Sequence, residues 1–414
     1  MHANLRHLHA FRQVARLGSV SAAARAVHIS QPAVTLAIAG LERYFDSPLL
    51  LRRSTGVSLT KAGEVCLGRI ERSLTQLRDA LGEATRGASA ERIAAAERLV
   101  RSTQLDALDA VVQHGNFSVA ARARQVSQPS IHRSARELER LLGVPLFEKT
   151  SFGITPTRAA EELSRRARLA FAEIEQARAE VHALSGGESG RTVIGAMPLA
   201  RSYLLPAALL EFTQEHPQHG VAIIEGTYEH LLAGLRSGES EVLIGALRDP
   251  APAPDIIQEH LFDDPLAIIV RAEHPLTRRR RLTAASLRNF QWIAPRAGSP
   301  LRVHFNALLA STGFEMPSPP LECNSLAAAR AFLLESDRIM LLSAHQIHYE
   351  MQAGLLVALP HPAGNVVRPI GLTLRRSWNP TNTQQRLLEI LRRSARAAAA
   401  SHARSGREGR NRRL

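Results

Sequence analysis

The chain has 414 residues, of which 52 are Lys or Arg and 38 are Asp or Glu, giving a formal net charge of +14. A hydrophobic content of 45% supplies cores for two or three domains and excludes a wholly disordered protein. No run approaches the ~18 consecutive apolar residues that a membrane-spanning helix needs, and charged residues interrupt the first apolar positions. We therefore expect a cytosolic protein without a signal peptide, in which Cys66 and Cys323 stay reduced.

The positive charge is concentrated at the two ends of the chain. Residues 1–100 carry 14 basic and 8 acidic side chains, residues 188–391 carry 18 and 19, and residues 392–414 carry 8 and 1. A basic N-terminal part beside a nearly neutral one indicates a polyanionic partner at the N-terminal end. Only Lys61 and Lys149 are lysines, so an arginine-rich overall composition is an alternative source of the excess.

The N-terminal part contains an internal repeat. Residues 8–63 align without a gap with residues 105–160 at a constant offset of 97, and 21 of the 56 aligned pairs are identical. The identical pairs fall in blocks, among them Ser30-Gln31-Pro32 with Ser127-Gln128-Pro129 and Leu41-Glu42-Arg43 with Leu138-Glu139-Arg140. One chain therefore carries two copies of one module.

Each copy predicts three short helices followed by a hairpin. In the first copy Gly18 ends an apolar helical stripe, and Ser19 is expected to cap an alanine-rich helix. Ser30 and its counterpart Ser127 are expected to cap the next helix, with a proline tolerated in its first turn. An alanine-rich helix, a short turn and a second helix indicate a helix-turn-helix, and the two short strands that follow indicate a wing.

The pattern changes after the second copy. Residues 157–184 predict a long amphipathic helix, closed by Ser185-Gly186-Gly187. Beyond it, apolar runs such as 193–195, 242–245 and 266–270 alternate with helical segments, which indicates α/β units with buried, largely parallel strands. The last residues, with polyalanine at 397–400 and scattered arginines, predict a basic disordered tail.

These motifs together resemble the LysR-type transcriptional regulators. The first copy resembles the winged helix-turn-helix of that family through Ala23-Ala24, Ser30-Gln31-Pro32-Ala33-Val34 and Leu59-Thr60-x-Ala62-Gly63. The later half resembles the effector domain of the family through Gly195-x-x-Pro198 and Val242-x-Ile244-Gly245. The resemblance covers nearly the whole chain up to about residue 395.

The resemblance implies a domain order and a function. It implies a multidomain α plus α/β protein. The DNA-binding part comprises winged helix-turn-helix modules at 5–63 and 102–160, a helical linker at 64–101, and a linker and dimerisation helix at 157–184. A two-lobed effector-binding domain resembling periplasmic binding proteins follows at 190–395, and the tail is at 396–414. Such a protein is a sequence-specific, DNA-binding transcriptional regulator at the bacterial nucleoid, without a cofactor or a membrane partner. Its expected partners are double-stranded DNA, a small organic anion as effector, and further copies of the chain as homodimers or homotetramers, with RNA polymerase left open.

The sequence also departs from the family. The family has one DNA-binding module per chain, and this chain has two. In the second copy Arg124 occupies the place of Val27, where an apolar residue is expected, so either its charged head reaches water or the second module is weakened or repurposed. We expect the second copy to hold the position that the family's module occupies and the first to be an added reader or brake.

Candidate site residues follow from the motifs and the resemblance. Outward-facing residues at the start of each second helix would read bases, and the wing residues would contact phosphate. The DNA-binding candidates are Gln31, Pro32, Ala33, Thr35, Arg52, Arg53, Thr55, Gln128, His132, Arg133 and Lys149. Residues at the ends of strands in the later half would line a cleft for the effector. The effector-binding candidates are Met197, Arg201, Ser202, Thr227, Leu247, Pro295, Arg296, Asn324 and Ser325.

Other functions that short motifs suggest have less support in the sequence. The segment 185–192 lacks the first Gly and the Lys of a phosphate loop, and His345-x-x-His348 has no evident third metal ligand. No nucleophile, base and orienting carboxylate converge in chain order, so we expect neither a metal site nor an enzyme. The alternative is a small-molecule-binding protein whose winged modules serve protein interaction or architectural DNA binding.

Overall fold

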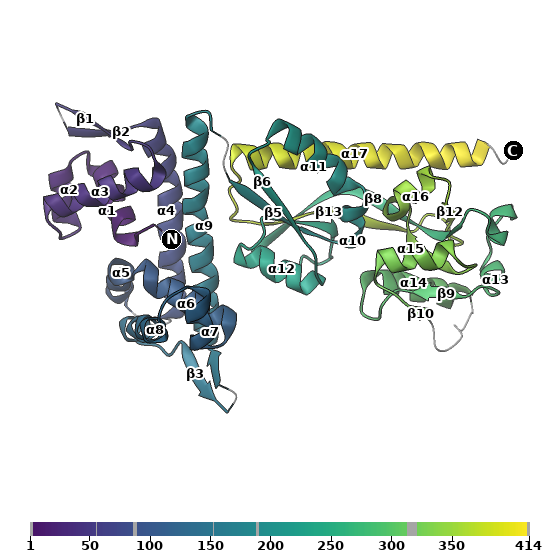
Figure 1. The fold of residues 1–414 in the computed structure, drawn as a ribbon, viewed down its shortest axis with the longest axis horizontal. Helices are drawn as coiled ribbons and strands as arrows, with labels where there is room; N and C mark the ends of the chain where they lie inside the picture. The colour runs from purple at the N-terminus through teal and green to yellow at the C-terminus, as the bar shows by residue number, and fades with distance from the viewer. Residues whose placement is uncertain are drawn as a thin grey trace. The chain divides into compact units, whose positions relative to one another are not determined.

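The computed structural model describes residues 3–54, 56–85, 89–151, 153–187, 190–312 and 321–411 (Figure 1). It divides into two compact units, one formed by residues 1–191 with the short segments 218–220 and 236–239, and one formed by the rest of the chain. Among the described residues, no helix is long and apolar enough to cross a membrane.

In the first unit, each helix and strand of the first module starts 97 residues before its counterpart. The first module contains α1 (Leu5–Leu17), α2 (Val20–Ala26), α3 (Gln31–Phe45), β1 (Leu50–Arg53), β2 (Gly56–Leu59) and α4 (Lys61–Ala84). Helix α5 (Ala90–Leu99) connects the modules. The second module contains α6 (Ser102–His114), α7 (Phe117–Ala123), α8 (Gln128–Leu142), β3 (Phe147–Thr150), β4 (Gly153–Pro156) and α9 (Arg158–Leu184).

Local sequence signals set the helix ends. Gly18 and Gly115 both end a helix in the left-handed region, with φ of 62°, where glycine carries no Cβ penalty. The Ser30 hydroxyl caps α3 by accepting from Ala33 N at 3.3 Å, as predicted. Ser127 has no side-chain cap bond, so the same prediction is wrong for α8.

The shared Leu-Glu-Arg block positions the wing. Glu42 Oε1 accepts hydrogen bonds from the backbone N–H groups of Leu49 at 2.9 Å and Leu50 at 3.3 Å. Glu139 makes the same pair of bonds in the second module, at 2.9 and 3.2 Å. Because a carboxylate bonded to backbone N–H groups fixes the chain, each wing starts at a set place relative to α3 or α8.

Arg124 is neither buried without a partner nor free in water. Its Nη2 donates to Asp109 Oδ2 at 2.9 Å, and its side chain is 38% exposed. Asp109 also accepts from Ser164 Oγ at 2.9 Å. The first module has Arg12 and Val27 at the positions of Asp109 and Arg124, so this ion pair belongs to the second module alone.

The two long helices α4 and α9 pack against each other inside one chain (Figure 1). Residues near the start of α4 contact the end of α9, as Arg69 does with Glu180, while Glu83 near the end of α4 contacts Arg166. The helices are therefore antiparallel. The apolar face of residues 157–184, which were expected to pair two chains, thus lies against α4 of the same chain.

The second unit is a mixed α/β structure. Its strands are β5 (Arg191–Ala196), β6 (Gly220–Ile224), β7 (Val242–Ala246), β8 (Ile256–Arg271), β9 (Trp292–Ala294), β10 (Leu321–Glu322), β11 (Ile339–Ser343), β12 (Leu356–Pro360) and β13 (Val367–Arg375). Its helices are α10 (Pro198–Ser202), α11 (Leu204–Glu215), α12 (Tyr228–Ser237), α13 (Ala284–Leu287), α14 (Pro300–Thr312), α15 (Leu326–Leu334), α16 (His348–Gln352) and α17 (Asn382–Asn411), with short 3-10 turns at Pro275–Arg278 and Ala344–Ile347.

The sheet corrects the expectation of largely parallel strands. The strand order is β10-β9-β11-β8-β13-β7-β5-β6, with β12 also on β8. Strand β8 pairs antiparallel with β11, β12 and β13, whereas β5 with β7 and β9 with its two neighbours are parallel. The first half of β8 lies in one lobe and its second half in the other, so one strand joins the two lobes.

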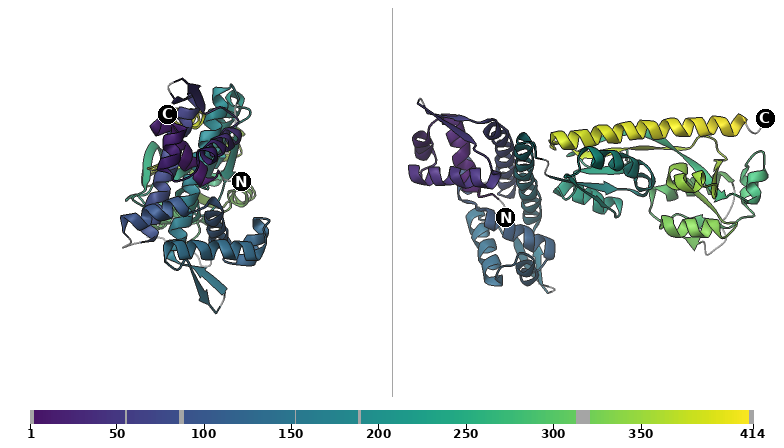
Figure 2. Two further views of the ribbon diagram at one scale, coloured as in Figure 1. Left: turned by 90° about the vertical axis from the view of Figure 1, so that its left-hand side faces the viewer. Right: turned by 45° about the horizontal axis from the view of Figure 1, so that its top comes forward.

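Helix α17 corrects the expected disorder from residue 396. The helix extends to Asn411 and packs on α11 and β8 (Figure 2). Ala395 and Ala398, on the side of the helix that packs against the rest of the unit, are fully buried. Alanine has the highest helix propensity, so the polyalanine run that suggested a frayed end instead continues the helix.

Candidate DNA-reading surface and effector cleft

Helices α3 and α8 expose matching polar residues at their N-terminal ends. Gln31, Thr35, Gln128 and His132 are all exposed, and the buried Val34 and Ile131 between them anchor each helix to its module. Pro32 is also exposed and Ala33 is half-buried. The positive end of a helix dipole beside polar side chains suits a phosphate backbone and base edges.

Each module orients its glutamine in the same way. Ser21 Oγ donates to Gln31 Oε1 at 3.1 Å, and Ser118 Oγ donates to Gln128 Oε1 at 2.8 Å. Because the amide oxygen accepts within the module, the amide N–H₂ group is the part left to donate outward. The neighbouring positions differ: Thr35 Oγ1 donates to the Gln31 carbonyl at 3.1 Å, and the His132 ring lies edge-on to Phe117 at 5.1 Å.

The wings present basic side chains. Arg52 and Arg53 on β1 and Lys149 on β3 are exposed, as is Arg133 on α8. Among the described residues, none forms an ion pair with these four side chains, which leaves their charges available to a polyanion. Thr55, the remaining DNA-binding candidate, lies outside the described residues.

In the second unit a cavity of about 160 Å³ lies between the two lobes. Five of the predicted effector residues line it: Met197, Pro295, Arg296, Asn324 and Ser325. Apolar side chains provide much of the remaining lining, namely Leu199, Leu301, Leu326, Met340, Leu342 and Ile370. Among the described lining residues there is no Asp or Glu.

Two helix N-termini face this cavity. Ser325 caps α15 by accepting from Ala328 N at 3.3 Å, and Ser299 with Pro300 begins α14. The loop before α14 is fixed by Arg302, whose Nη1 donates to the Pro295 carbonyl at 2.8 Å. Helix N-termini carry partial positive charge, so two of them at one cavity favour an anionic ligand.

Arg368 on β13 is a cavity residue that sequence reasoning missed. It is 9% exposed, its Nη2 donates to Asp264 Oδ2 at 2.7 Å, and its Nε has no hydrogen-bond partner. Asp264 also accepts from Ser343 Oγ at 2.5 Å and lies 2.9 Å from His345 Nδ1. In the sequence, Arg368 could have been recognised as the single charged residue in the otherwise apolar run from Val367 to Leu372.

The Asp264 carboxylate is the counter-charge that holds Arg368. Burial alone would raise the pKa of this carboxyl, but hydrogen bonds from His345 and Ser343 and the Arg368 charge lower the pKa below its usual value. Asp264 therefore stays ionised at neutral pH, and Arg368 stays oriented while its Nε lacks a partner. A buried donor without a partner is costly, and a ligand acceptor would satisfy it.

The other four effector candidates do not line the cavity. Arg201 forms an ion pair with Glu225, and Ser202 Oγ donates to the Pro198 carbonyl at 3.5 Å. Thr227 caps α12 by accepting from His230 N at 3.2 Å. Leu247 N donates to the Pro369 carbonyl at 2.9 Å. These residues serve local structure in the lobe that holds α10 and α12.

Met197 reaches the cavity because Gly245 has no side chain. A Cβ at Gly245 would lie 2.4 Å from Met197 Cγ, closer than any real Cβ contact. The Met197 N–H also donates to the Ile244 carbonyl at 3.0 Å. The glycine in Val242-x-Ile244-Gly245 therefore allows β7 and the end of β5 to place Met197 in the cleft.

Comparison with known proteins is consistent with this architecture. The family model described as "LysR substrate binding domain" matches residues 185–396, and the model of the bacterial regulatory helix-turn-helix protein, lysR family, matches twice, at residues 5–64 and 102–161. The regulator GalR of Pseudomonas putida is 35% identical over 372 residues, which cover 90% of this chain and 92% of that protein.

More distant proteins extend the comparison. The regulator PcaQ of Agrobacterium fabrum is 29% identical over 278 residues, covering 67% of this chain and 89% of that protein. The structure of a full-length OxyR variant from Pseudomonas aeruginosa matches with a TM-score of 0.52 and 24% identity, covering 71% of this chain and 94% of that one, and it supports the fold alone. The two helix-turn-helix matches, the effector-domain match and the 35% identity together show that this chain belongs to the LysR family of bacterial transcriptional regulators, with its DNA-binding module duplicated.

Proposed function

We propose that this regulator responds to a small organic acid that binds between the two lobes of its second unit. The single observation that carries the proposal is Arg368, held by Asp264 at the cavity with an Nε that has no partner. Arg296 and two helix N-termini add positive charge at the same place. The apolar lining suits an acid with a compact hydrocarbon body.

Titration with acids and their neutral analogues tests the ligand class. Calorimetry of the full chain with small carboxylates and the matching amides should detect binding of acids only. Arg296→Ala should weaken that binding about tenfold, the loss of one charge-assisted contact. Arg280→Ala, in an exposed part of the same unit, is the matched control and should leave it unchanged. Equal binding of amides and acids would overturn the proposal.

The acid regulates only if it distinguishes two states of the protein. A ligand shifts promoter occupancy by no more than its difference in affinity for those states. We therefore expect operator affinity to change when the acid is present, and the same change in an Arg296→Ala chain to need about tenfold more acid. An acid that binds without changing operator affinity would leave the cleft as a site without a regulatory role.

For DNA we propose that the exposed residues of α3 and α8 read bases and that the wings contact phosphate. Replacing Gln31 and Thr35 by Ala should relax sequence preference. Replacing Arg52 and Arg53 should weaken binding to all duplexes and reduce the slope of log affinity against log salt by about 1 per contact. Footprints that neither pair of substitutions changes would contradict these roles.

The remaining parts of the proposal follow from DNA binding. The protein would act on chromosomal DNA in the bacterial cytoplasm, as an assembly of several chains, and it would catalyse no reaction. Because the apolar face of α9 is covered within the chain, contacts between chains would use other surfaces. Sedimentation of the full chain over a concentration series would test this assembly.

A further inference from the structure

The contacts between α4 and α9 are reciprocal. Arg69 Nη2 lies 2.6 Å from Glu180 Oε1, and Arg166 Nη2 lies 2.6 Å from Glu83 Oε2. Adding 97 converts Arg69 into Arg166 and Glu83 into Glu180, so the two ion pairs are the same contact made twice with the modules exchanged. In such contacts residue i touches j and j touches i, which is the property of a two-fold interface between identical subunits.

The apolar part of this contact has the same symmetry. Equivalent positions of the two helices are buried together: Cys66 and Leu163, Ile70 and Ala167, Leu74 and Phe171, Leu77 and Ile174, Ala80 and Ala177, Ala84 and Val181. The modules also meet at equivalent ends, because Ser102, the first residue of α6, accepts from the N–H of Leu5, the first residue of α1, at 3.3 Å. The two modules are therefore related as the halves of a dimer.

The interface resists separation. Arg69 is 1% exposed and is bonded to Glu173 at 3.0 Å and Gln176 at 2.5 Å as well as to Glu180. Pulling α9 away would leave this arginine without its partners and expose a continuous apolar face. The two reading helices are thus held at a fixed mutual position by a contact within the chain.

The two reading helices carry different side chains at equivalent positions. Gln31 and Gln128 are the same, but Thr35 corresponds to His132 and Leu36 to Arg133. Leu36 is 72% exposed and can meet an apolar group such as a thymine methyl, whereas an exposed arginine suits guanine or phosphate. The two modules therefore present the same glutamine to DNA, but the side chains beside that glutamine suit different bases.

We propose that a single chain presents α3 and α8 as the two halves of an intramolecular dimer and recognises an asymmetric duplex site with two unlike elements. A two-fold symmetric dimer recognises a palindrome because its two halves are identical. In this chain the two modules are related by the same symmetry, but the exposed residues of α3 and α8 differ. The inference rests on the proposed DNA-reading roles of α3 and α8.

Cross-linking tests whether the pairing is intramolecular. In a Cys323→Ser chain, with Cys66 fully buried, Glu83→Cys and Arg166→Cys would be joined by a short bismaleimide. We expect linked product of single-chain mass at every protein concentration, with the peptides around 83 and 166 joined. Glu83→Cys alone is the control and should give no such peptide pair. Linked product of two-chain mass would overturn the inference.

Selection from a random duplex pool tests the asymmetric site with the full chain. We expect an enriched motif with two different elements, in which Thr35→Ala relaxes one element and His132→Ala relaxes the other. Arg43→Ala and Arg140→Ala, exposed at the far ends of the same helices, are matched controls and should keep both base preferences. Two identical elements, or both substitutions acting on the same element, would overturn the inference.

The outcome of the selection distinguishes a wrong asymmetric site from a wrong assignment of base reading to α3 and α8. A pool without any enriched sequence would reject base reading by either helix, and the asymmetric site with it. An enriched symmetric motif, or a motif changed by one substitution only, would keep base reading and reject the asymmetric site alone.

Discussion

At the scale of single residues, an ion pair present in only one module stabilises that module. Asp109 is buried between Arg124, Ser164 and Arg168, while the first module has Arg12 and Val27 at the two key positions. Burial raises the pKa of the Asp109 carboxyl, and the neighbouring cations offset this only in part. Arg168, Ser164 and Arg124 therefore act together to favour the charged form of this carboxylate.

Arg124→Val restores the residue of the first module and should destabilise the second by about 1 kcal/mol. The value is that of a partly exposed pair, because the Arg124 side chain is more than one third in water. Urea unfolding followed by the helical circular dichroism signal measures it. Arg122→Ala, exposed in the last turn of α7 just before Arg124, is the control and should cost less. Equal effects of the two substitutions would show that the pair contributes nothing.

At the scale of elements, the two equivalent ion pairs between α4 and α9 should differ in strength. Arg69 is buried, and Glu180→Ala should cost about 2 kcal/mol because Glu173 and Gln176 remain as partners. Glu83→Ala, the same change in the other copy, should cost less than about 1 kcal/mol because Arg166 and Glu83 are each about one third exposed. The unfolding midpoints of the two variants give the comparison, and equal shifts would contradict it.

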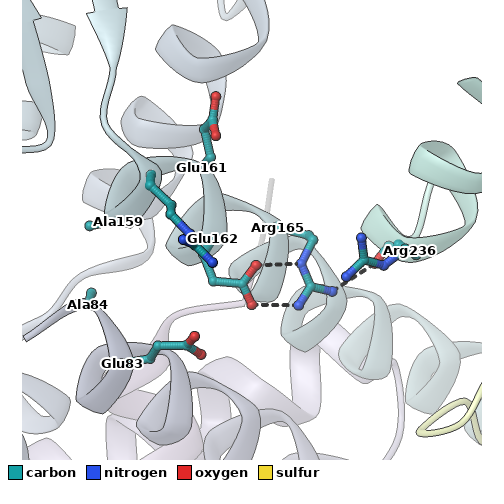
Figure 3. A pocket seen from close by; sticks show the side chains of 8 residues that line it. Glu83, Ala84, Ala159, Glu161, Glu162, Arg165 and Arg236 are labelled. Carbon is teal, nitrogen blue, oxygen red and sulfur yellow. Dashed lines mark hydrogen bonds and ion pairs between the residues drawn. The ribbon is translucent and has the colours of Figure 1, made fainter. Parts of the chain in front are cut away.

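The start of α9 should give the first unit a pH-dependent stability. Burial would raise the pKa of the Glu162 carboxyl, but hydrogen bonds from Arg165 and Arg166 lower the pKa to about 2 (Figure 3 shows the pair with Arg165). An unfolded Glu has a pKa of about 4.3, so the ionised group stabilises the folded unit above that pH, and this contribution is lost as the pH falls through about 2.

Glu162→Gln tests this contribution. The variant should be less stable than the natural chain at pH 7, and the difference should shrink as the pH falls from about 4 towards 2. Thermal unfolding across this range measures both chains. A difference that stays constant over the whole range would show that the carboxylate charge is not the cause.

The helices and wings of both modules could be predicted from sequence because their signals are local. Gly18, Ser30 and the shared proline mark ends that the structure confirms. The pairing of α4 with α9 could not be predicted in the same way. An amphipathic pattern indicates that a helix packs against another element, but it does not identify that element. Arg368 was missed for a related reason: its role depends on Asp264, a residue 104 positions away.

At the scale of the whole molecule, one chain joins a duplicated DNA-binding unit to a sensing unit. The basic excess lies in residues 1–100 and 392–414, whereas residues 188–391, which include Arg296 and Arg368 at the cavity, are nearly neutral. The proposed account thus assigns DNA and the small acid to separate parts of the chain, as the coupling of two sites requires.

The most direct test of this account compares affinities of the full chain for a selected duplex and a random duplex over a series of salt concentrations. We predict a ratio of at least ~10³ for the natural chain. Gln31→Ala and Gln128→Ala should each lower that ratio and leave the salt dependence of random-duplex binding unchanged, since neither side chain is charged. A ratio near one, or a ratio that only one of the two substitutions lowers, would contradict the reading of DNA by both modules.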